Sequence, residues 1–114
     1  HKTFDGIICI DVLEHLLNPG NAIKEFYRVL KDNGKIVVKV STSLENPEWF
    51  YNDYTHIRPF TSYSIQLLLK DYHFKIIEIQ NYYEEWEGKK FLEGFLVFGE
   101  KKWNQNHCYY LVEE

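Results

Sequence analysis

The order of apolar and polar positions predicts strands and helices in alternation along this chain. The apolar run at residues 6–10 is typical of a strand in a parallel sheet that is covered on both faces. Apolar residues then recur at helical spacing from Ala22 to Leu30, and the β-branched run at 35–40 indicates a second strand. Two strands with a helix between them predict an α/β domain.

Turn residues mark the boundaries of these elements. Asn18 and Asn21 are candidate N-caps for the helix, on either side of a Pro-Gly pair. The helix ends at Asp32-Asn33-Gly34, where Asn33 or Gly34 suits a left-handed conformation. Right-handed crossovers between the strands place the helices against the faces of the sheet.

The second half of the chain begins with a long polar and aromatic loop at residues 41–61, and loops of this length usually carry function. Thr61 or Ser62 is expected to cap a helix over residues 64–71. Strands are expected at 74–80 and 91–99, and the charged turn between them favours antiparallel pairing. The predicted fold is therefore an α/β sheet with one antiparallel strand near the end.

Composition and charge narrow the classes of function. The chain has 114 residues and a net charge of −4, which argues against nucleic-acid or anionic-membrane binding because both need a basic surface. Cys9 and Cys108 do not form a disulfide framework, so a reducing, cytoplasmic location is expected. No apolar run reaches the roughly 18 residues of a membrane span, and no signal-peptide pattern is present.

The first strand runs directly into a loop that carries Asp11, Glu14 and His15. In open α/β sheets, ligands bind beyond the carboxyl ends of the strands, so a site is expected at this loop. The alternative is that Asp11 orders the loop, and that Glu14 and His15 hydrogen-bond to neighbouring backbone.

Two segments carry a resemblance to a known family. Residues 4–40, FDGIICIDVLEHLLNPGNAIKEFYRVLKDNGKIVVKV, resemble the second half of a class I S-adenosylmethionine-dependent methyltransferase. The shared pattern is FD, an apolar strand, a VLEH-L loop, a Pro-containing turn, an E-x-x-RVLK helix, a Gly turn and an apolar strand. Residues 53–61, DYTHIRPFT, resemble the D-x-x-H-x-x-x-F stretch of the same family. The subgroup with ubiquinone, menaquinone and other small-molecule methyltransferases is the most similar.

The resemblance implies a specific part of the family's fold. The family's Rossmann-like sheet has the strand order 3-2-1-4-5-7-6 with strand 7 antiparallel, and residues 1–102 would supply strands 4, 5, 6 and 7 with their flanking helices. The N-terminal half, with its glycine-rich cofactor loop, is then missing. Residues 103–114 form a tail that the pattern does not assign.

The chain contains no methionine and reaches a strand within a few residues, so we expect it to be a fragment that is inactive alone. An open strand 4 edge predicts self-association. The alternative is a complete small domain in which the first strand is a true edge.

The resemblance also implies roles for individual residues. Ile10 and Asp11 would contact the cofactor S-adenosylmethionine, and His15 would act as a general base during methyl transfer. His56, Arg58 and Tyr54 would form the substrate wall. The alternative is that His56 is hydrogen-bonded inside a loop held down by the aromatic residues Trp49, Phe50, Tyr51 and Phe60. Asp11, His15, Asp53 and His56 could converge as metal ligands, but no metal site is expected, because there are no Cys pairs and no H-x-x-x-H spacing and histidine with carboxylate is weakly specific.

The predicted function is methyl transfer from S-adenosylmethionine to a small-molecule acceptor, by direct displacement at the methyl carbon, as part of a longer chain. The alternative is a non-catalytic, methyltransferase-like binding or interaction module. A third arrangement, in which a second copy of the chain supplies the missing strands, also remains open.

Overall fold

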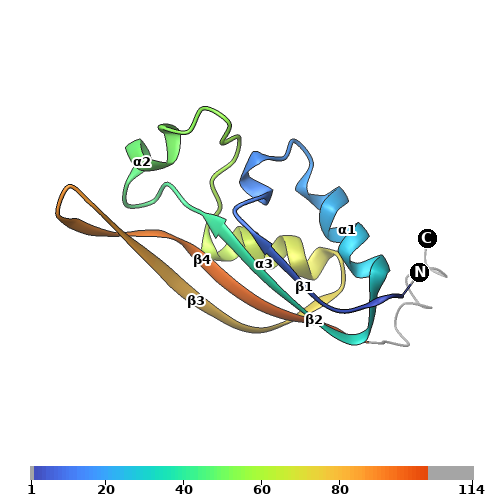
Figure 1. The fold of residues 1–114 in the computed structure, drawn as a ribbon. Helices are drawn as coiled ribbons and strands as arrows, with labels where there is room; N and C mark the ends of the chain where they lie inside the picture. The colour runs from blue at the N-terminus through green and yellow to red at the C-terminus, as the bar shows by residue number, and fades with distance from the viewer. Residues whose placement is uncertain (1, 103–114) are drawn as a thin grey trace.

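The computed structural model describes residues 2–102, so the predicted tail at 103–114 and Cys108 lie outside the described residues. Along the chain, the elements are β1 (Phe4–Ile10), the 3-10 helix η1 (Leu13–His15), α1 (Pro19–Val29), β2 (Leu30–Ser41), α2 (Pro47–Tyr51), α3 (Ser62–Asp71), β3 (Phe74–Trp86) and β4 (Lys89–Lys101) (Figure 1). None of the helices in the described part of the chain is long and apolar enough to span a membrane.

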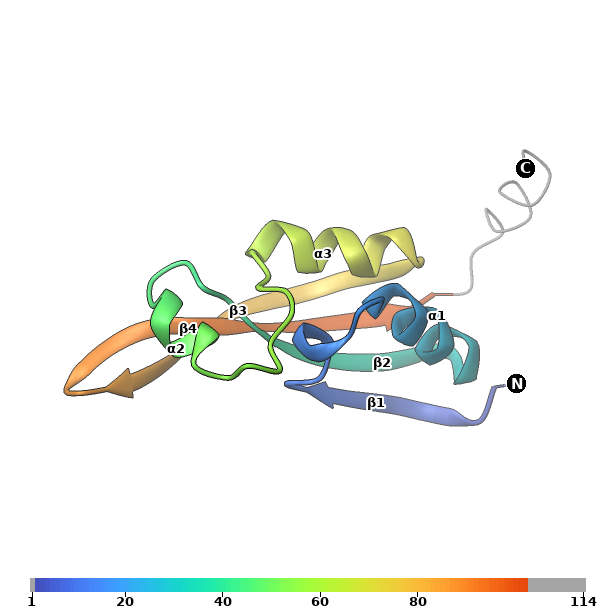
Figure 2. The ribbon, with the colours of Figure 1, turned by 90° about the horizontal axis from the view of Figure 1, so that it is seen from above.

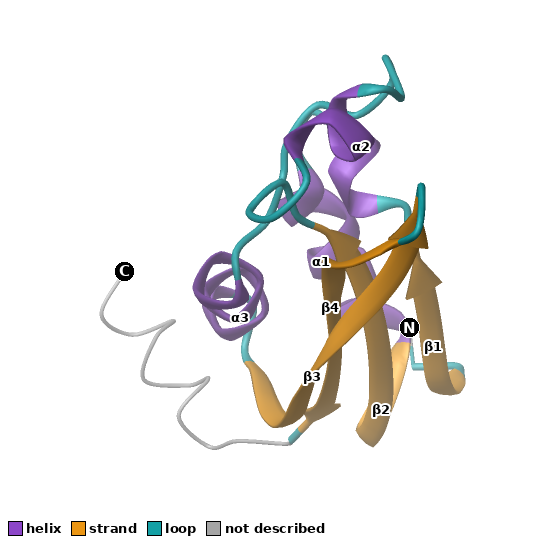
Figure 3. Ribbon diagram, turned by 90° about the vertical axis from the view of Figure 1, so that its left-hand side faces the viewer, coloured by secondary structure: helices purple, strands orange, loops and turns teal. Residues whose placement is uncertain are grey.

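The strands form a mixed sheet with the order β1-β2-β4-β3 (Figure 3). β1 and β2 are parallel, with Cys9 opposite Val38, and β4 is antiparallel to both β2 and β3. This order confirms the predicted α/β sheet with an antiparallel strand, in the arrangement 4-5-7-6 of the methyltransferase fold. The carboxyl ends of β1 and β2 therefore lie at the same edge of the sheet.

The core lies between the sheet and the two longer helices. α1 and α3 contact each other, and α3 also packs on β3 and β4. Burial alternates in the middle of β2, as expected for a strand with one covered face, whereas its last four residues, at 38–41, are all buried. The core comprises Cys9, Leu13, Ile23, Leu30, Ile36, Val38, Val40, Phe60, Ile65, Leu69, Phe74, Leu92, Phe95 and Val97. Figure 2 shows α1 and α2 toward opposite ends of the sheet, with α3 between them.

β1 differs from the expectation of a strand covered on both faces. Within the described residues only Cys9 of this strand is buried, while Ile8 is 73% exposed and Ile10 is 53% exposed. The physical reason is that β1 is an edge strand, paired among the described strands with β2 alone, and that the core lies on the Cys9 side. Its apolar residues therefore form an open surface on this chain.

The boundaries of the elements follow their capping residues. Asn18 is the N-cap residue of α1, and Thr61 forms a capping box with Ser64 at the start of α3. Asn33 rather than Gly34 has the left-handed conformation, with φ 66°. The 41–61 loop contains the short helix α2, whose N-cap Asn46 accepts a hydrogen bond from the Trp49 N–H at 3.0 Å.

The β3–β4 hairpin is longer than the sequence predicts. Its turn is confined to Glu87 and Gly88, which both have positive φ (53° and 76°), as two-residue hairpins with a primed turn require. The strands thus extend beyond the end of β2. Gly94 allows β4 to lie against β2 here, since a Cβ at this position would lie 2.0 Å from the Val40 carbonyl oxygen.

Candidate functional site

A pocket of about 540 Å³ lies at the carboxyl ends of β1 and β2, where the sequence predicts a ligand site. Its walls come from these two strands, from η1, from the 49–56 segment and from the β3–β4 hairpin. The lining residues are Ile10, Asp11, Glu14, His15, Lys39, Ser41, Trp49, Asp53, His56, Tyr82, Glu84, Glu93 and Leu96. The pocket therefore combines titratable side chains from both halves of the chain.

Backbone hydrogen bonds bring the two histidines together although they are 41 positions apart. The Glu14 carbonyl oxygen in η1 accepts hydrogen bonds from the N–H groups of Ile57 (2.7 Å) and Arg58 (3.2 Å). These bonds attach the loop after α2 to η1. The rings of His15 and His56 then lie 4.7 Å apart, measured between their centroids.

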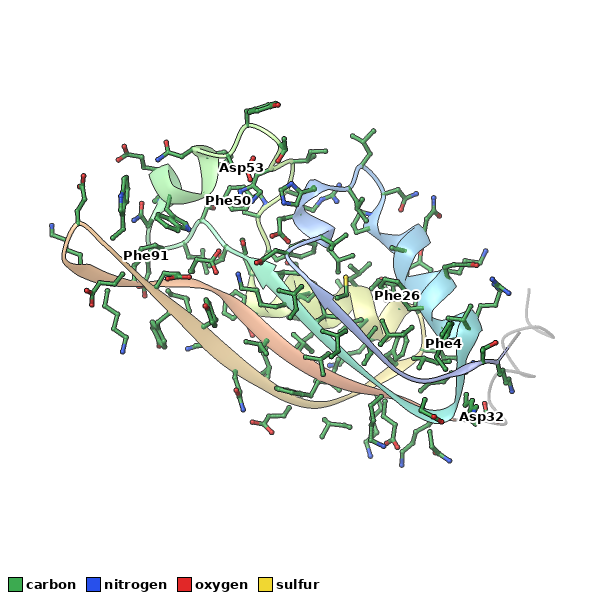
Figure 4. All side chains as sticks on the ribbon, viewed as in Figure 1. Phe4, Phe26, Asp32, Phe50, Asp53 and Phe91 are labelled. Atoms are coloured by element: carbon green, nitrogen blue, oxygen red, sulfur yellow. The ribbon has the colours of Figure 1, made fainter. Side chains whose placement is uncertain are left out.

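Each histidine is oriented through its Nδ1 atom. His56 Nδ1 lies 2.6 Å from the Phe50 carbonyl oxygen, and its ring stacks on Phe50 at 4.3 Å. His15 Nδ1 lies 3.2 Å from the carbonyl oxygen of Thr55 and 2.9 Å from its hydroxyl oxygen. Figure 4 shows Phe50 and Asp53 at the end of the molecule opposite Phe4 and Asp32. Asp53 Oδ2 lies 3.5 Å from His56 Nε2.

A buried cation lines the same pocket. The Lys39 ammonium donates hydrogen bonds to Asp11 Oδ1 (2.7 Å) and to the carboxylate of Glu93, and it lies 4.8 Å from the centre of the Tyr82 ring. Burial by itself lowers the pKa of Lys39, but the bonds to the two carboxylates outweigh it and hold this pKa above its usual value. Lys39 is therefore charged.

Glu14 is fully buried and poorly partnered. Oε2 of Glu14 lies 3.2 Å from the Ser41 hydroxyl oxygen. The same hydroxyl oxygen lies closer to Oε2 of Glu93, at 2.7 Å. Its Oε1 has no hydrogen-bond partner among the described residues. Burial raises the pKa of Glu14. Burial, together with the nearby Glu14 carboxylate, raises the pKa of the Cys9 thiol to about 11.

Four of the six predicted site residues meet in this pocket: Ile10, Asp11, His15 and His56. Tyr54 is 94% exposed and does not line it. Arg58 does not line it either, and its guanidinium lies 3.5 Å from the Leu17 carbonyl oxygen. The substrate-binding roles of Tyr54 and Arg58 therefore stay predictions from the sequence.

The sequence analysis missed the buried polar residues Lys39, Ser41 and Glu93. A signal for them exists, because Lys39 is the only charged residue in the apolar run at 36–40 and Glu93 is the only one in the run at 91–99. A charge at such a position is almost never buried unless it is paired. The pairing itself depends on the register of β2 and β4, where Ser41 is opposite Gly94.

Comparison with solved structures places this fold among methyltransferases. A putative methyltransferase from Bacillus halodurans matches with a TM-score of 0.73 and 17% identity, over 90% of this chain and 66% of that protein. An S-adenosylmethionine-dependent methyltransferase from Archaeoglobus fulgidus matches with a TM-score of 0.74 and 16% identity, over 88% and 60%. The 1,6-didemethyltoxoflavin N1-methyltransferase of Burkholderia thailandensis, solved with S-adenosylhomocysteine, matches with a TM-score of 0.68 and 20% identity, over 87% and 44%.

Comparison of sequences identifies the family. An uncharacterized protein of Methanocaldococcus jannaschii is 38% identical over 86 residues, which cover 72% of this chain and 35% of that protein. This chain thus spans about a third of the length of that relative. A family model described as a methyltransferase domain matches residues 1–79. Since this match covers more than half of the chain, the chain belongs to the methyltransferase-domain family.

Proposed function

We propose that this chain forms one wall of the active site of an S-adenosylmethionine-dependent methyltransferase that acts on a small-molecule acceptor, as part of a longer chain. The observation that carries the proposal is the pocket at the carboxyl ends of β1 and β2, which joins Ile10 and Asp11 to His15 and His56. The family membership and the sheet order support methyl transfer at this edge.

The residues on the β1 side fit a sulfonium cofactor. Ile10 offers exposed apolar surface, and the Asp11 carboxylate offers negative charge to the sulfonium or amino group of S-adenosylmethionine. Lys39 donates a hydrogen bond to Oδ1 of Asp11 and offsets part of that charge. The Asp11 side chain nevertheless remains half-exposed and lines the pocket. The bound cofactor supplies an electrophilic methyl group. Ile10 and Asp11, which both line the pocket, would form one side of the cofactor site.

The residues on the η1 side face the acceptor. Because Nδ1 of His15 is held by Thr55, the neutral ring has its Nε2 lone pair available to accept a proton from an acceptor hydroxyl or amine. General-base catalysis of this kind contributes roughly 10²–10⁴-fold. Alignment of donor and acceptor by the pocket contributes a further ~7–11 kcal/mol.

The test measures binding of S-adenosylhomocysteine to the full-length protein by calorimetry. Replacement Ile10→Arg should weaken binding at least tenfold, because it places a cation beside the cofactor. The control is Ile77→Arg on β3, which changes an equally exposed isoleucine that does not line the pocket. His15→Ala should leave the affinity unchanged. A folded protein that does not bind S-adenosylhomocysteine would favour the non-catalytic module instead.

A further inference from the structure

Three ligand atoms of the pocket converge in a way that the sequence spacing does not reveal. One carboxylate oxygen of Glu14 and one ring nitrogen each of His15 and His56 lie within 4.8 Å of one another. We propose that Glu14, His15 and His56 bind a divalent first-row transition-metal ion in this pocket. The expectation of no metal site rested on missing sequence motifs. The ligands are instead brought together by the hydrogen bonds that the Glu14 carbonyl oxygen accepts from the backbone N–H groups of Ile57 and Arg58.

The tautomers of both histidines suit metal binding. A carbonyl oxygen only accepts hydrogen bonds, so Nδ1 of His56 carries the hydrogen in its contact with Phe50. The same holds for Nδ1 of His15 with the Thr55 carbonyl, and the Thr55 hydroxyl hydrogen is already donated to Asp53. With the hydrogen on Nδ1, the neutral form of either ring has a lone pair on Nε2. Metal-binding histidines almost always have this second hydrogen bond, which fixes the ring and raises its basicity.

Glu14 provides the second, independent observation. A buried carboxylate normally accepts several hydrogen bonds, because an unpaired buried charge is costly. Glu14 is fully buried, yet its Oε1 has no partner within the described chain. Its Oε2 shares a single hydroxyl hydrogen with Glu93, and the shorter distance favours Glu93. A metal ion at Oε1 would supply the missing partner.

The charge of the surrounding pocket also favours a cation. Five carboxylates line it, from Asp11, Glu14, Asp53, Glu84 and Glu93, against the single ammonium of Lys39. That ammonium is engaged by Asp11 and Glu93, so it does not neutralise Glu14 through a hydrogen bond. Asp53 Oδ2 lies beside His56 Nε2, at 3.5 Å, at the rim of the ligand cluster.

The ligand set indicates the class of metal. Two imidazoles and a carboxylate suit Zn²⁺, Mn²⁺, Fe²⁺ or Co²⁺, whereas Mg²⁺ and Ca²⁺ prefer oxygen ligands alone. Three protein ligands leave coordination positions open, as in catalytic metal sites. The cluster borders the pocket, so an open position can face an acceptor molecule.

A catalytic role for this metal rests on the proposed function. An acceptor hydroxyl bound to the metal would lose its proton to solvent more easily, because the cation stabilises the oxyanion. The oxygen then forms a bond to the methyl carbon while the carbon–sulfur bond breaks, and its electron pair goes to sulfur to give S-adenosylhomocysteine. In the metal-bound protein, His15 is a ligand, so the metal replaces it as the group that activates the acceptor.

The test titrates Co²⁺ and Zn²⁺ into metal-stripped full-length protein, with calorimetry and the visible absorption of Co²⁺ as readouts. One equivalent should bind to the wild type. Glu14→Gln, His15→Ala and His56→Ala should each weaken binding at least tenfold. The matched control is His73→Asn, because His73 lies in the α3–β3 connection and has positive φ (74°), a conformation that asparagine tolerates. Wild-type affinity in all three variants, or no binding to the wild type, would overturn the proposal.

Binding of S-adenosylhomocysteine to the same metal-free variants separates this proposal from methyl transfer. It also shows that each variant is folded. Normal S-adenosylhomocysteine binding without metal binding would reject the metal and leave His15 as the base. Metal binding that depends on the three ligands, without cofactor binding, would retain the metal site and reject the methyltransferase role.

Discussion

Two buried glutamates of the same pocket have opposite surroundings. Glu93 on β4 accepts a hydrogen bond on each carboxylate oxygen, from the Lys39 ammonium and from the Ser41 hydroxyl. Glu14 in η1 has one oxygen without a partner in the described chain and another that competes with Glu93 for the same hydroxyl. Burial is similar at both residues, so the difference in partners separates a glutamate that stabilises the fold from one that is available to a ligand.

The largest effect is expected from breaking the pair at Glu93. Replacement Lys39→Met would leave Glu93 buried without its counter-ion, and removal of one partner from a buried pair costs about 3–5 kcal/mol. Urea unfolding of the variant should show this loss of unfolding free energy. The double variant Lys39→Met with Glu93→Leu should recover most of it, because apolar residues of similar volume replace both charges.

An intermediate effect is expected from the pH dependence of Cys9. The thiol pKa is raised from 9.0 to about 11 in the folded protein, so the unfolded chain ionises first and stability falls as pH rises through this window. Two pKa units correspond to about 2.7 kcal/mol. Urea unfolding measured from pH 8 to pH 11 should show a larger decrease of the unfolding free energy in the wild type than in Cys9→Ala.

The same measurement sharpens the comparison between the glutamates. The Glu14 carboxylate contributes to the raised pKa of Cys9 in the folded protein. Glu14→Gln should therefore narrow the pH range over which ionisation of Cys9 lowers the stability. Glu93→Gln serves as the contrast and should leave the window unchanged. An equal effect of both substitutions would mean that the two carboxylates act on Cys9 alike. It would contradict the expected electrostatic difference between Glu14 and Glu93.

The smallest effect is expected for the stability of Glu14→Gln in metal-free protein. Because Glu14 has no complete set of partners to lose, its neutral isostere should change the unfolding free energy by less than about 1 kcal/mol. Thermal and urea unfolding in the presence of a chelator provide the measurement. A loss as large as that of Lys39→Met would show that Glu14 is structural.

The sequence predicts those parts of the molecule that depend on local pattern. The run at residues 6–10, the helical spacing after Asn18 and the cap at Thr61 each reflect interactions between near neighbours, and the structure contains the corresponding β1, α1 and α3. The location of the pocket is also predictable, because parallel strands end at a common edge. The short helix α2 is not predicted from the sequence, because its five residues are too few to show a helical period.

The parts that the sequence does not predict depend on distant contacts. The ion pair of Lys39 with Glu93 requires the register between β2 and β4, which the close approach at Gly94 permits. The meeting of His15 and His56 requires two hydrogen bonds to one backbone carbonyl, which any residue at position 14 can provide. Neither of these two contacts produces a recognisable spacing of residues in the sequence.

The position of β4 between β2 and β3 has a consequence for synthesis on the ribosome. β4 is the last strand along the described chain, yet it occupies an inner place in the sheet. Glu93 is made 54 residues after Lys39, which at 5–20 residues per second is a delay of about 3–11 seconds. During that interval β2 has no neighbour on its β4 side, so a nascent chain must wait for β4 before this half of its sheet can close.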